Sequence, residues 1–585
     1  MNNSEETNPI PPVSQEPEGP RTGAESLPAI GSPSRRRFLG RAGGFAAATL
    51  AAGSVGISSM TESAATTAEA GTIGPLTADQ RRLRCLQLRQ IAAEFQSNQP
   101  LPYQISNADD DVYANRMGSF SKAFQHNSLG DVDPNAYQKY LIALTSGNPS
   151  DFEAIPLGGT VKLANPQAAF AYDLEGADSH HVSIPPAPRF ESAEEGAEMI
   201  EVYWQALLRD VPFSQYGNEP LSIAAVNDLG RQRNFEQTTA ANLFRGDFAG
   251  EQTGPYLSQF LWKLIPYGAM TIDQRYRVPF PAADFMTRYE SWLNIQNGVP
   301  PADGIPYDAT LRYLRNGRDL GEYVHLDFSY QAFLNAAMIL LGFGSGALDD
   351  SNPYKGSLRQ GAFSTFGGPF ILDLVARVAN KALRAAWYQK WAVHRRLRPE
   401  EFGGRVHNHM TRAAQYPIAS NLLESPATAA VFNRFGSFLL PMAYAEGCPT
   451  HPAYPAGHAV IAGACVTALK AFFKESAVIP NPVAATDDGL QLEPYNGQLT
   501  IGGELNKLAA NISLGRDFGG VHWRSDGVQG MLLGEAVAIS VLSDMNGCFN
   551  ERFQGFSLTK FDGSVIVLNS GPSPSTRFVR TGGRL

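Results

Sequence analysis

Apolar residues recur at intervals of three and four through much of the chain, which is the spacing of amphipathic helices. The helical patterns occupy 256–266, 281–296, 328–342, 370–397, 457–475, 503–514 and 525–543. Two more helices are predicted to begin at Thr77-x-x-Gln80 and Ser192-x-x-Glu195, which have the form of capping boxes. Residues 560–568 contain an Asp-Gly turn signal and predict a hairpin. The pattern therefore predicts an all-α protein with long loops and minor β-hairpins.

Composition agrees with a large folded protein. Apolar residues make up 43% of the 585 residues and charged residues 18%, which excludes disorder over most of the length. The formal net charge of -9 argues against a nucleic-acid or anionic-membrane partner. Because no polar linker interrupts the chain after residue 75, residues 71–585 are expected to form a single large helical domain. Four cysteines are too few for a disulfide scaffold, although one or two bridges are compatible with the sequence.

The first 70 residues look like a targeting segment. Residues 1–33 are rich in Pro, Ser, Glu and Gly and resemble a disordered leader. Ser34-Arg-Arg-Arg-Phe-Leu39 then precedes a mildly apolar run, and Ala68-Glu-Ala70 offers the small-x-small pattern of a signal-peptidase site. Together these features match a twin-arginine export signal. The mature protein is therefore expected in the periplasm or outside the cell, and no later segment has 18 uninterrupted apolar residues.

Candidate chemistry is concentrated in residues 387–526 and begins with a basic run that ends in proline. Pro399 is expected to terminate a helix and to leave Arg398 at its end. Eight residues turn a regular helix by about 800°, so Lys390 and Arg398 meet at one anion only if the last turn unwinds. Taken alone, such a run is more often a solvated basic face of a helix.

Two further clusters follow. Residues 451–458 form a Pro- and Gly-rich turn before an apolar helix, where free backbone N–H groups and the helix dipole suit an anion. In the last cluster, Arg516 offers another anion donor, and Asp526 stands four residues after His522. On one helix that carboxylate accepts a hydrogen bond from the imidazole and leaves the other nitrogen basic. A zinc site is less favoured, because no carboxylate or cysteine cluster completes a ligand set.

Together the three clusters resemble the motifs shared by vanadium haloperoxidases and type 2 phosphatidic acid phosphatases. The family pattern is Lys before Arg-Pro, then Pro-Ser-Gly-His, then Arg with five residues before His. In this chain it is Lys390…Arg398-Pro399, Pro455-Ala456-Gly457-His458 and Arg516…His522. The seven-residue gap before Arg398 is similar to that of algal-type bromoperoxidases, and the likeness to this subgroup extends over most of residues 75–585. It implies a large helical haloperoxidase fold with two four-helix bundles.

The resemblance implies one bound orthovanadate as cofactor, with His522 as the axial ligand of vanadium and Asp526 holding the tautomer of His522. The resemblance also implies four groups that bind the vanadate oxygens: Lys390, Arg398, the Gly457 amide and Arg516. It implies that His458 transfers protons and that Trp387 and His451 lie beside a halide pocket. Lys390 would also polarise the peroxide. The implied reaction oxidises bromide, or iodide or chloride, with hydrogen peroxide to a hypohalous acid that halogenates a small organic acceptor.

One departure from the family leaves alternatives open. Ala456 replaces the family serine, so a hydroxyl that would bond a vanadate oxygen is absent. Loss of one hydrogen bond to a charged group costs about 1.5–3 kcal/mol unless water substitutes. An exported acid phosphatase that uses His522 as nucleophile and His458 as acid is the alternative enzyme, and a non-catalytic oxyanion binder is a third hypothesis. By analogy with algal-type relatives we expect a homo-oligomer, a dimer or larger.

Overall fold

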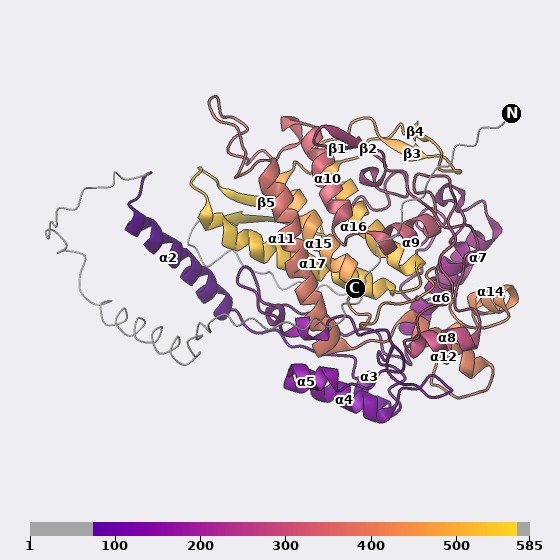
Figure 1. The fold of residues 1–585 in the computed structure, drawn as a ribbon. Coiled ribbons are helices and arrows are strands. Elements are labelled where there is room, and N and C mark those ends of the chain that lie inside the picture. Colours follow the sequence, from indigo (N-terminus) through magenta and orange to yellow (C-terminus); the bar gives the residue numbers. More distant parts are fainter. Residues whose placement is uncertain (1–73, 570–585) are drawn as a thin grey trace, which may run out of the picture. The chain divides into compact units, whose positions relative to one another are not determined.

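The computed structural model describes residues 74–569. The chain divides into two compact units, Met1–Asp79 and Gln80–Leu585. Only residues 74–79 of the first unit are described, so the export signal and its cleavage pattern lie outside the described residues. All candidate site residues belong to the second unit, which is shown in Figure 1.

Helices dominate the described residues, which confirms the all-α prediction. The α-helices are α2 (Ala78–Ser97), α3 (Asp109–Val112), α4 (Pro134–Ser146), α5 (Pro149–Glu153), α6 (Ala193–Leu208), α7 (Pro220–Leu229), α8 (Tyr289–Gln296), α9 (Gly317–Leu326), α10 (Gln331–Gly342), α11 (Gly368–Trp387), α12 (Pro399–Met410), α13 (Ser420–Leu423), α14 (Pro426–Phe435), α15 (Gly457–Phe472), α16 (Ile501–Phe518) and α17 (Arg524–Met545). The strands pair as antiparallel hairpins: β1 (Ile265–Tyr267) with β2 (Met270–Ile272), β3 (Val483–Ala485) with β4 (Leu492–Pro494), and β5 (Gly555–Thr559) with β6 (Val565–Asn569). The last pair is the hairpin predicted near residues 560–568.

The core is built around α15, which packs against α11, α16 and α17 (Figure 1). Every residue of α15 except His458 is buried, because the helix is apolar on all sides. Two glycines let α15 and α17 approach closely. A Cβ added at Gly463 would lie 2.0 Å from the Met531 carbonyl oxygen, and one at Gly534 would lie 2.0 Å from the Val460 carbonyl oxygen. The bundle therefore holds the beginning of α15 in a fixed place.

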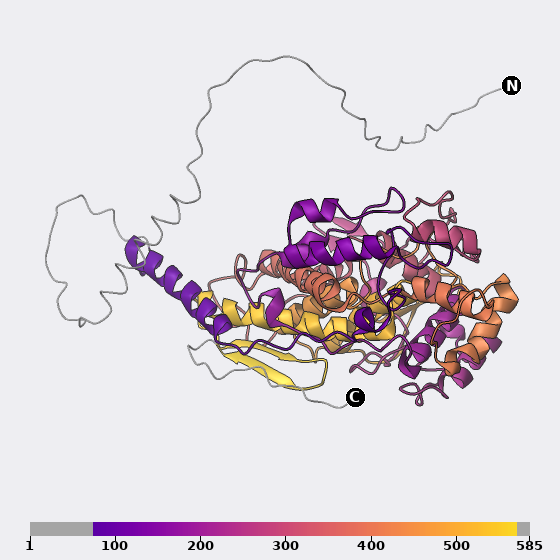
Figure 2. The same ribbon diagram turned by 90° about the horizontal axis from the view of Figure 1, so that it is seen from below.

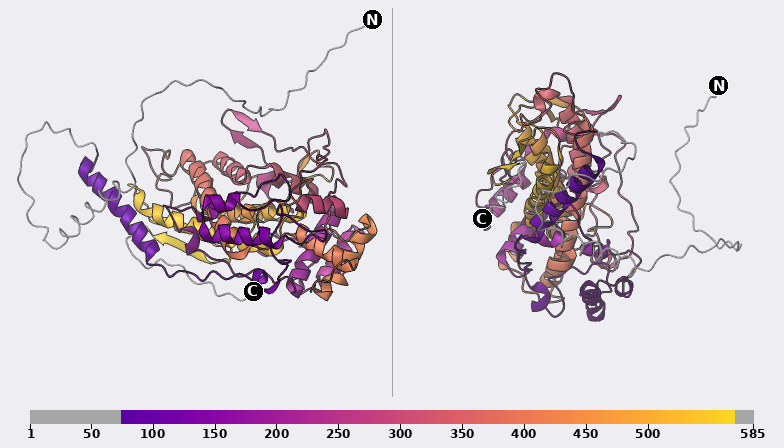
Figure 3. Two further views of the ribbon diagram at one scale, coloured as in Figure 1. Left: turned by 60° about the horizontal axis from the view of Figure 1, so that its bottom comes forward. Right: turned by 90° about the vertical axis from the view of Figure 1, so that its left-hand side faces the viewer.

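A second group of helices, α6, α7, α13 and α14, packs together beyond the core bundle (Figure 3). Ser192 caps α6 as predicted, because its hydroxyl accepts a hydrogen bond from the Glu195 amide at 3.1 Å. The β5–β6 hairpin lies alongside α17 at the other end of the bundle (Figure 2). α16 contacts α6 and so joins the two groups of helices.

α17 is the one helix in residues 74–569 that is long and apolar enough to cross a membrane. In its most apolar window, 67% of the residues are buried inside the protein. Core helices of soluble proteins pass the same test, so this property of α17 is explained by its central position in the bundle.

Three predicted helices differ from the structure. Residues 256–266 form only a short 3-10 turn, Gln259–Leu261, and the start of β1. There, bonds to α16 replace helical ones: the Ser258 amide donates to Asn511 and the Gln259 amide to Glu504, each at 2.8 Å. In the segment 281–296 a helix begins only at Tyr289, because the preceding residues pair as a bridge with residue 442. The α-helix predicted over 370–397 ends at Trp387, where a π-helical segment begins.

Candidate oxyanion site

Lys390 lies on a π-helical segment, Tyr388–His394, that continues α11. The following residue, Arg395, has a positive φ of 46° and ends the segment. This is the unwinding that the spacing of Lys390 and Arg398 requires. The Lys390 ammonium is fully buried and donates hydrogen bonds to the carbonyl oxygens of Pro452 at 2.8 Å and Ala453 at 2.7 Å.

Arg398 sits just before α12, and Pro399 is the first residue of that helix. The prediction that Pro399 terminates a helix is therefore wrong: proline suits the first turn of a helix, whose N–H groups have no intrahelical acceptor. The buried guanidinium donates to the carbonyl oxygens of His451 at 3.0 Å and Val521 at 2.7 Å. Its Nη1 also lies 3.0 Å from Nε2 of His522, and its Nη2 lies 2.9 Å from Nδ1 of His451.

His522 and Asp526 pair as the i, i+4 spacing predicts. Nδ1 of His522 lies 2.7 Å from Oδ2 of Asp526, and both side chains are buried. Burial lowers the pKa of His522 well below its usual range, and the charge of Arg398 adds to this effect. The neutral imidazole therefore donates its Nδ1 proton to the carboxylate and presents a lone pair on Nε2.

A buried ionic network holds Asp526 from behind, and no motif in the sequence indicates it. Oδ1 of Asp526 accepts a hydrogen bond from Arg396 at 2.8 Å. Arg396 also pairs with Glu198 at 2.9 Å and, by a very short contact, with Glu195. The Ser192-x-x-Glu195 spacing predicts that the Glu195 side chain completes a capping box, but its carboxylate pairs with Arg396 instead. α6, which carries Glu195 and Glu198, reaches Arg396 only through tertiary packing.

Arg516, near the end of α16, belongs to the same positive cluster. Its Nη1 donates to the Val324 carbonyl oxygen at 2.7 Å, whereas its buried Nε has no hydrogen-bond partner among the described residues. The charges of Arg516 and Arg398 help to lower the pKa of Lys390, although burial is the largest cause. Among the described residues none of these three buried cations forms a salt bridge, and the nearby carboxylate of Asp526 is already paired with Arg396.

The beginning of α15 borders this cluster. Ala456 precedes the helix, and its amide donates to the Asp526 carbonyl oxygen at 2.9 Å. Nε2 of His458 lies 2.9 Å from Oδ1 of Asp327, a buried residue that follows α9. In the part of the chain that the structure describes, this is the only hydrogen bond of the His458 ring, so His458 does not bond directly to Lys390, Arg398 or His522. No motif in the sequence indicates a role for Asp327.

Trp387 and His451 lie beside the same turn. Their ring centroids are 4.7 Å apart, and Trp387 is anchored by a hydrogen bond of 3.2 Å from its Nε1 to the Ala164 carbonyl oxygen. A Cβ added at Gly457 would lie 3.5 Å from the Trp387 ring. Burial, followed by the charge of Lys390, lowers the pKa of His451 well below its usual range. The pair therefore forms a neutral aromatic wall against the cationic cluster.

These residues fit a tetrahedral oxyanion. Buried charges in proteins are normally paired, yet Lys390, Arg398 and Arg516 have carbonyl oxygens or an imidazole as partners. Nε of Arg516 has no partner among the described residues and remains for a ligand, whereas the lone pair on Nε2 of His522 faces Nη1 of Arg398 at 3.0 Å, a contact that a ligand at Nε2 would replace. An anion with several oxygens would accept charge-assisted hydrogen bonds from the cations and bond to Nε2 of His522. Within residues 74–569 no group of three His, Cys, Asp or Glu side chains could hold a metal cation.

His394 lies four residues after Lys390, a spacing that predicts a histidine on the helix surface. The structure buries it instead: His394 is only 4% exposed, and its ring packs edge-on against Tyr454 with centroids 4.7 Å apart. Neither ring nitrogen has a hydrogen-bond partner in the described part of the chain, and burial lowers its pKa to about 3. The π-helical segment turns it inward. It serves the packing of the site rather than its chemistry.

Comparison with known proteins identifies the family. A family model described as the VCPO second helical-bundle domain matches residues 374–551. The vanadium-dependent bromoperoxidase of Ascophyllum nodosum is 36% identical over 496 residues, which cover 80% of this chain and 88% of that protein. The enzyme of Corallina pilulifera with the same name is 34% identical over 583 residues, covering 82% of this chain and 97% of that protein.

A solved structure agrees with this relationship. The second vanadate-dependent bromoperoxidase of Ascophyllum nodosum, described as homohexameric, superposes with a TM-score of 0.79 at 29% identity. The match covers 86% of this chain and 94% of that one. The chain therefore belongs to the vanadium-dependent bromoperoxidase family.

Proposed function

We propose that the protein is a vanadium-dependent bromoperoxidase that oxidises bromide with hydrogen peroxide. The balanced reaction consumes peroxide, bromide and one proton and yields hypobromous acid and water. Hypobromous acid then halogenates a small organic acceptor. The related bromoperoxidases support this activity, and they do not favour the phosphatase alternative.

One observation carries the proposal: a neutral, buried His522 presents Nε2 among three buried cations that lack carboxylate partners of their own. His522 would hold vanadium through Nε2, and Lys390, Arg398, Arg516 and the Gly457 amide would hold the vanadate oxygens. Bound vanadate supplies a V(V) Lewis acid that activates peroxide without changing its oxidation state. Asp526 keeps the Nδ1 proton of His522 in place, which preserves the ligating lone pair.

The remaining residues serve proton transfer and halide access. Because Nε2 of His458 is held by Asp327, its Nδ1 is the nitrogen left to give and take protons. Lys390 would polarise a bound peroxide through its ammonium group. Trp387 and His451 form a wall where a weakly hydrated halide can approach the positive cluster.

The test uses protein stripped of oxyanions. Orthovanadate should restore bromination of a phenolic dye with peroxide and bromide, and excess phosphate should abolish it by competing for the site. Parallel samples without vanadate measure phosphate-ester hydrolysis. Absence of bromination at saturating vanadate would overturn the proposal, and ester hydrolysis alone would establish the phosphatase.

We also propose export and self-association, each on separate grounds. The twin-arginine pattern of residues 34–39 and the cleavage pattern of residues 68–70 support a periplasmic or extracellular location. A fusion of residues 1–70 to a reporter tests export, which replacement of the arginines by lysine should block. The homohexameric relative supports a homo-oligomer, which light scattering would measure.

A further inference from the structure

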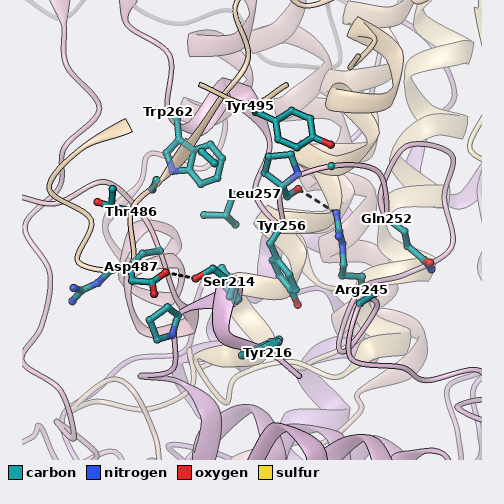
Figure 4. Close-up of a pocket in the computed structure, with 18 of the residues that line it drawn as sticks. Ser214, Tyr216, Arg245, Gln252, Tyr256, Leu257, Trp262, Thr486, Asp487 and Tyr495 are labelled. Atoms are coloured by element: carbon teal, nitrogen blue, oxygen red, sulfur yellow. Dashed lines mark hydrogen bonds between the residues drawn. The ribbon is translucent and has the colours of Figure 1, made fainter. Parts of the chain in front are cut away.

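A cavity of about 560 Å³ lies away from the oxyanion cluster and shares no lining residue with it. Segments 212–216, 240–262 and 484–495 form its walls together with Arg315, whose guanidinium is already bonded to Asp319 and to the Asp488 carbonyl oxygen (Figure 4). The helix α16 backs one wall, because Phe518, two residues after Arg516, packs against Phe213 at 5.7 Å. A volume of this size accommodates a small organic ligand.

Aromatic rings line the cavity in fixed orientations. Phe213 and Tyr256 stack with centroids 4.0 Å apart and an interplanar angle of 6°. Tyr216 meets both rings edge-on, at 5.6 Å and 5.8 Å. Trp262 is held by a hydrogen bond of 2.9 Å from its Nε1 to the Leu314 carbonyl oxygen. These rigid faces favour a planar aromatic ligand at little cost in conformational entropy.

Opposite charges stand on the two sides of the cavity. Figure 4 shows Arg245 on one side and Asp487 on the other, with Tyr256 and Leu257 between them. Within residues 74–569 Arg245 forms no salt bridge, and its buried Nε has no hydrogen-bond partner. The exposed Asp487 already accepts hydrogen bonds from Ser214 and Gln215 and can accept another from a ligand hydroxyl.

We propose that this cavity binds a phenolic carboxylate, with the ring against Phe213 and Tyr256, the carboxylate at Arg245 and the hydroxyl at Asp487. A guanidinium without a carboxylate partner is suited to a carboxylate ligand. That the ligand is also the organic acceptor rests on the proposed function. In that reaction a ring carbon beside the hydroxyl attacks the bromine of hypobromous acid. The C–Br bond forms, the Br–O bond breaks, and the ring proton leaves with the hydroxide as water.

Calorimetry on the full chain without vanadate tests binding directly. 3-(4-Hydroxyphenyl)propanoate should bind saturably at one site, and tyramine, which carries the opposite charge, at least tenfold more weakly. Arg245→Gln should weaken the carboxylate ligand at least tenfold, and Arg245→Lys less. Because Arg245 also bonds to the Pro255 carbonyl oxygen, Ala241→Trp provides a second variant that fills the cavity. Arg233→Gln, at an exposed arginine outside the cavity, is the control.

Each outcome decides the inference. No binding of the propanoate at millimolar concentration, or binding that Arg245→Gln and Ala241→Trp leave unchanged, overturns it. Bromination is measured separately, with vanadate, bromide and peroxide. If binding holds and a small phenolic dye is not brominated, the proposed function fails and the binding site stands. If the dye is brominated but Ala241→Trp leaves the KM for the propanoate unchanged, the site is not the acceptor site.

Discussion

Nδ1 of His522 lies 2.7 Å from Oδ2 of Asp526, and the other oxygen of that carboxylate is bonded to Arg396. His522 is therefore the last member of a chain of buried ionic contacts. This arrangement fixes which nitrogen carries the proton, because an ionised carboxylate can only accept. The imidazole stays neutral because burial and the neighbouring cations lower the pKa of His522.

Asp526→Asn should weaken vanadate binding by about 10–100-fold, because the carboxylate that accepts the Nδ1 proton of His522 and orients the ring loses its charge. It also removes an ion-pair partner of Arg396, so thermal stability is measured alongside. Equilibrium dialysis with orthovanadate gives the affinity. Asp273→Asn, at an exposed carboxylate whose one salt bridge within residues 74–569 is with Arg275, is the matched control. Unchanged affinity in Asp526→Asn would show that His522 needs no such support.

Ala456→Ser should tighten vanadate binding about tenfold or more, because the new hydroxyl adds a hydrogen bond to the anion. Serine before α15 should also stabilise the protein without vanadate by about 0.5–2 kcal/mol as a helix cap. Ala456→Gly separates the two effects, since it changes the cap without adding a hydroxyl. Equal vanadate affinities in all three proteins would mean that water already occupies the hydroxyl position.

His458→Ala should lower turnover by about 10²–10⁴-fold while vanadate binding stays within a few fold, because a proton-transferring group is lost and the anion cage is kept. Asp327→Asn should give a smaller loss and a changed pH profile, since Asp327 holds Nε2 of His458. Asp303→Asn, at an exposed carboxylate, is the control. If turnover and its pH profile in Asp327→Asn match the wild type, the pair has no part in proton transfer.

His394 predicts a pH dependence of stability. Burial lowers the pKa of His394 to about 3, whereas an exposed histidine in the unfolded chain has a pKa of about 6.5. Between these two values only the unfolded chain binds this proton. Wild-type stability should therefore fall, relative to His394→Leu, by about 1.4 kcal/mol per pH unit below about pH 6.5. Urea unfolding at pH 7.5, 6 and 5 measures this difference. A flat difference for His394→Leu would show that the folded protein protonates this ring freely.

The helices that could be predicted from the sequence are those whose structure is determined by the local pattern of residues. The helices near 457–475, 503–514 and 525–543 could be predicted because their apolar residues recur at helical spacing. The segment 256–266 was equally apolar, but its backbone bonds to α16 rather than to itself, which no local pattern records.

The candidate site divides in the same way. His522 and Asp526 are four residues apart on the chain, so their pairing could be predicted. Asp327, Arg396 and Glu195 reach their partners only through tertiary contacts, across as many as 201 residues in the case of Arg396 and Glu195. A single sequence carries no signal for such pairs.

The central claim is that one vanadate, held at His522, makes this chain a bromide-oxidising enzyme. The most direct measurement titrates the stripped protein with orthovanadate and determines, in the same samples, bound vanadium per chain and the rate of bromination. The account predicts saturation at one vanadium per chain, a rate proportional to occupancy, and loss of both in His522→Ala. Full occupancy without bromination would contradict it.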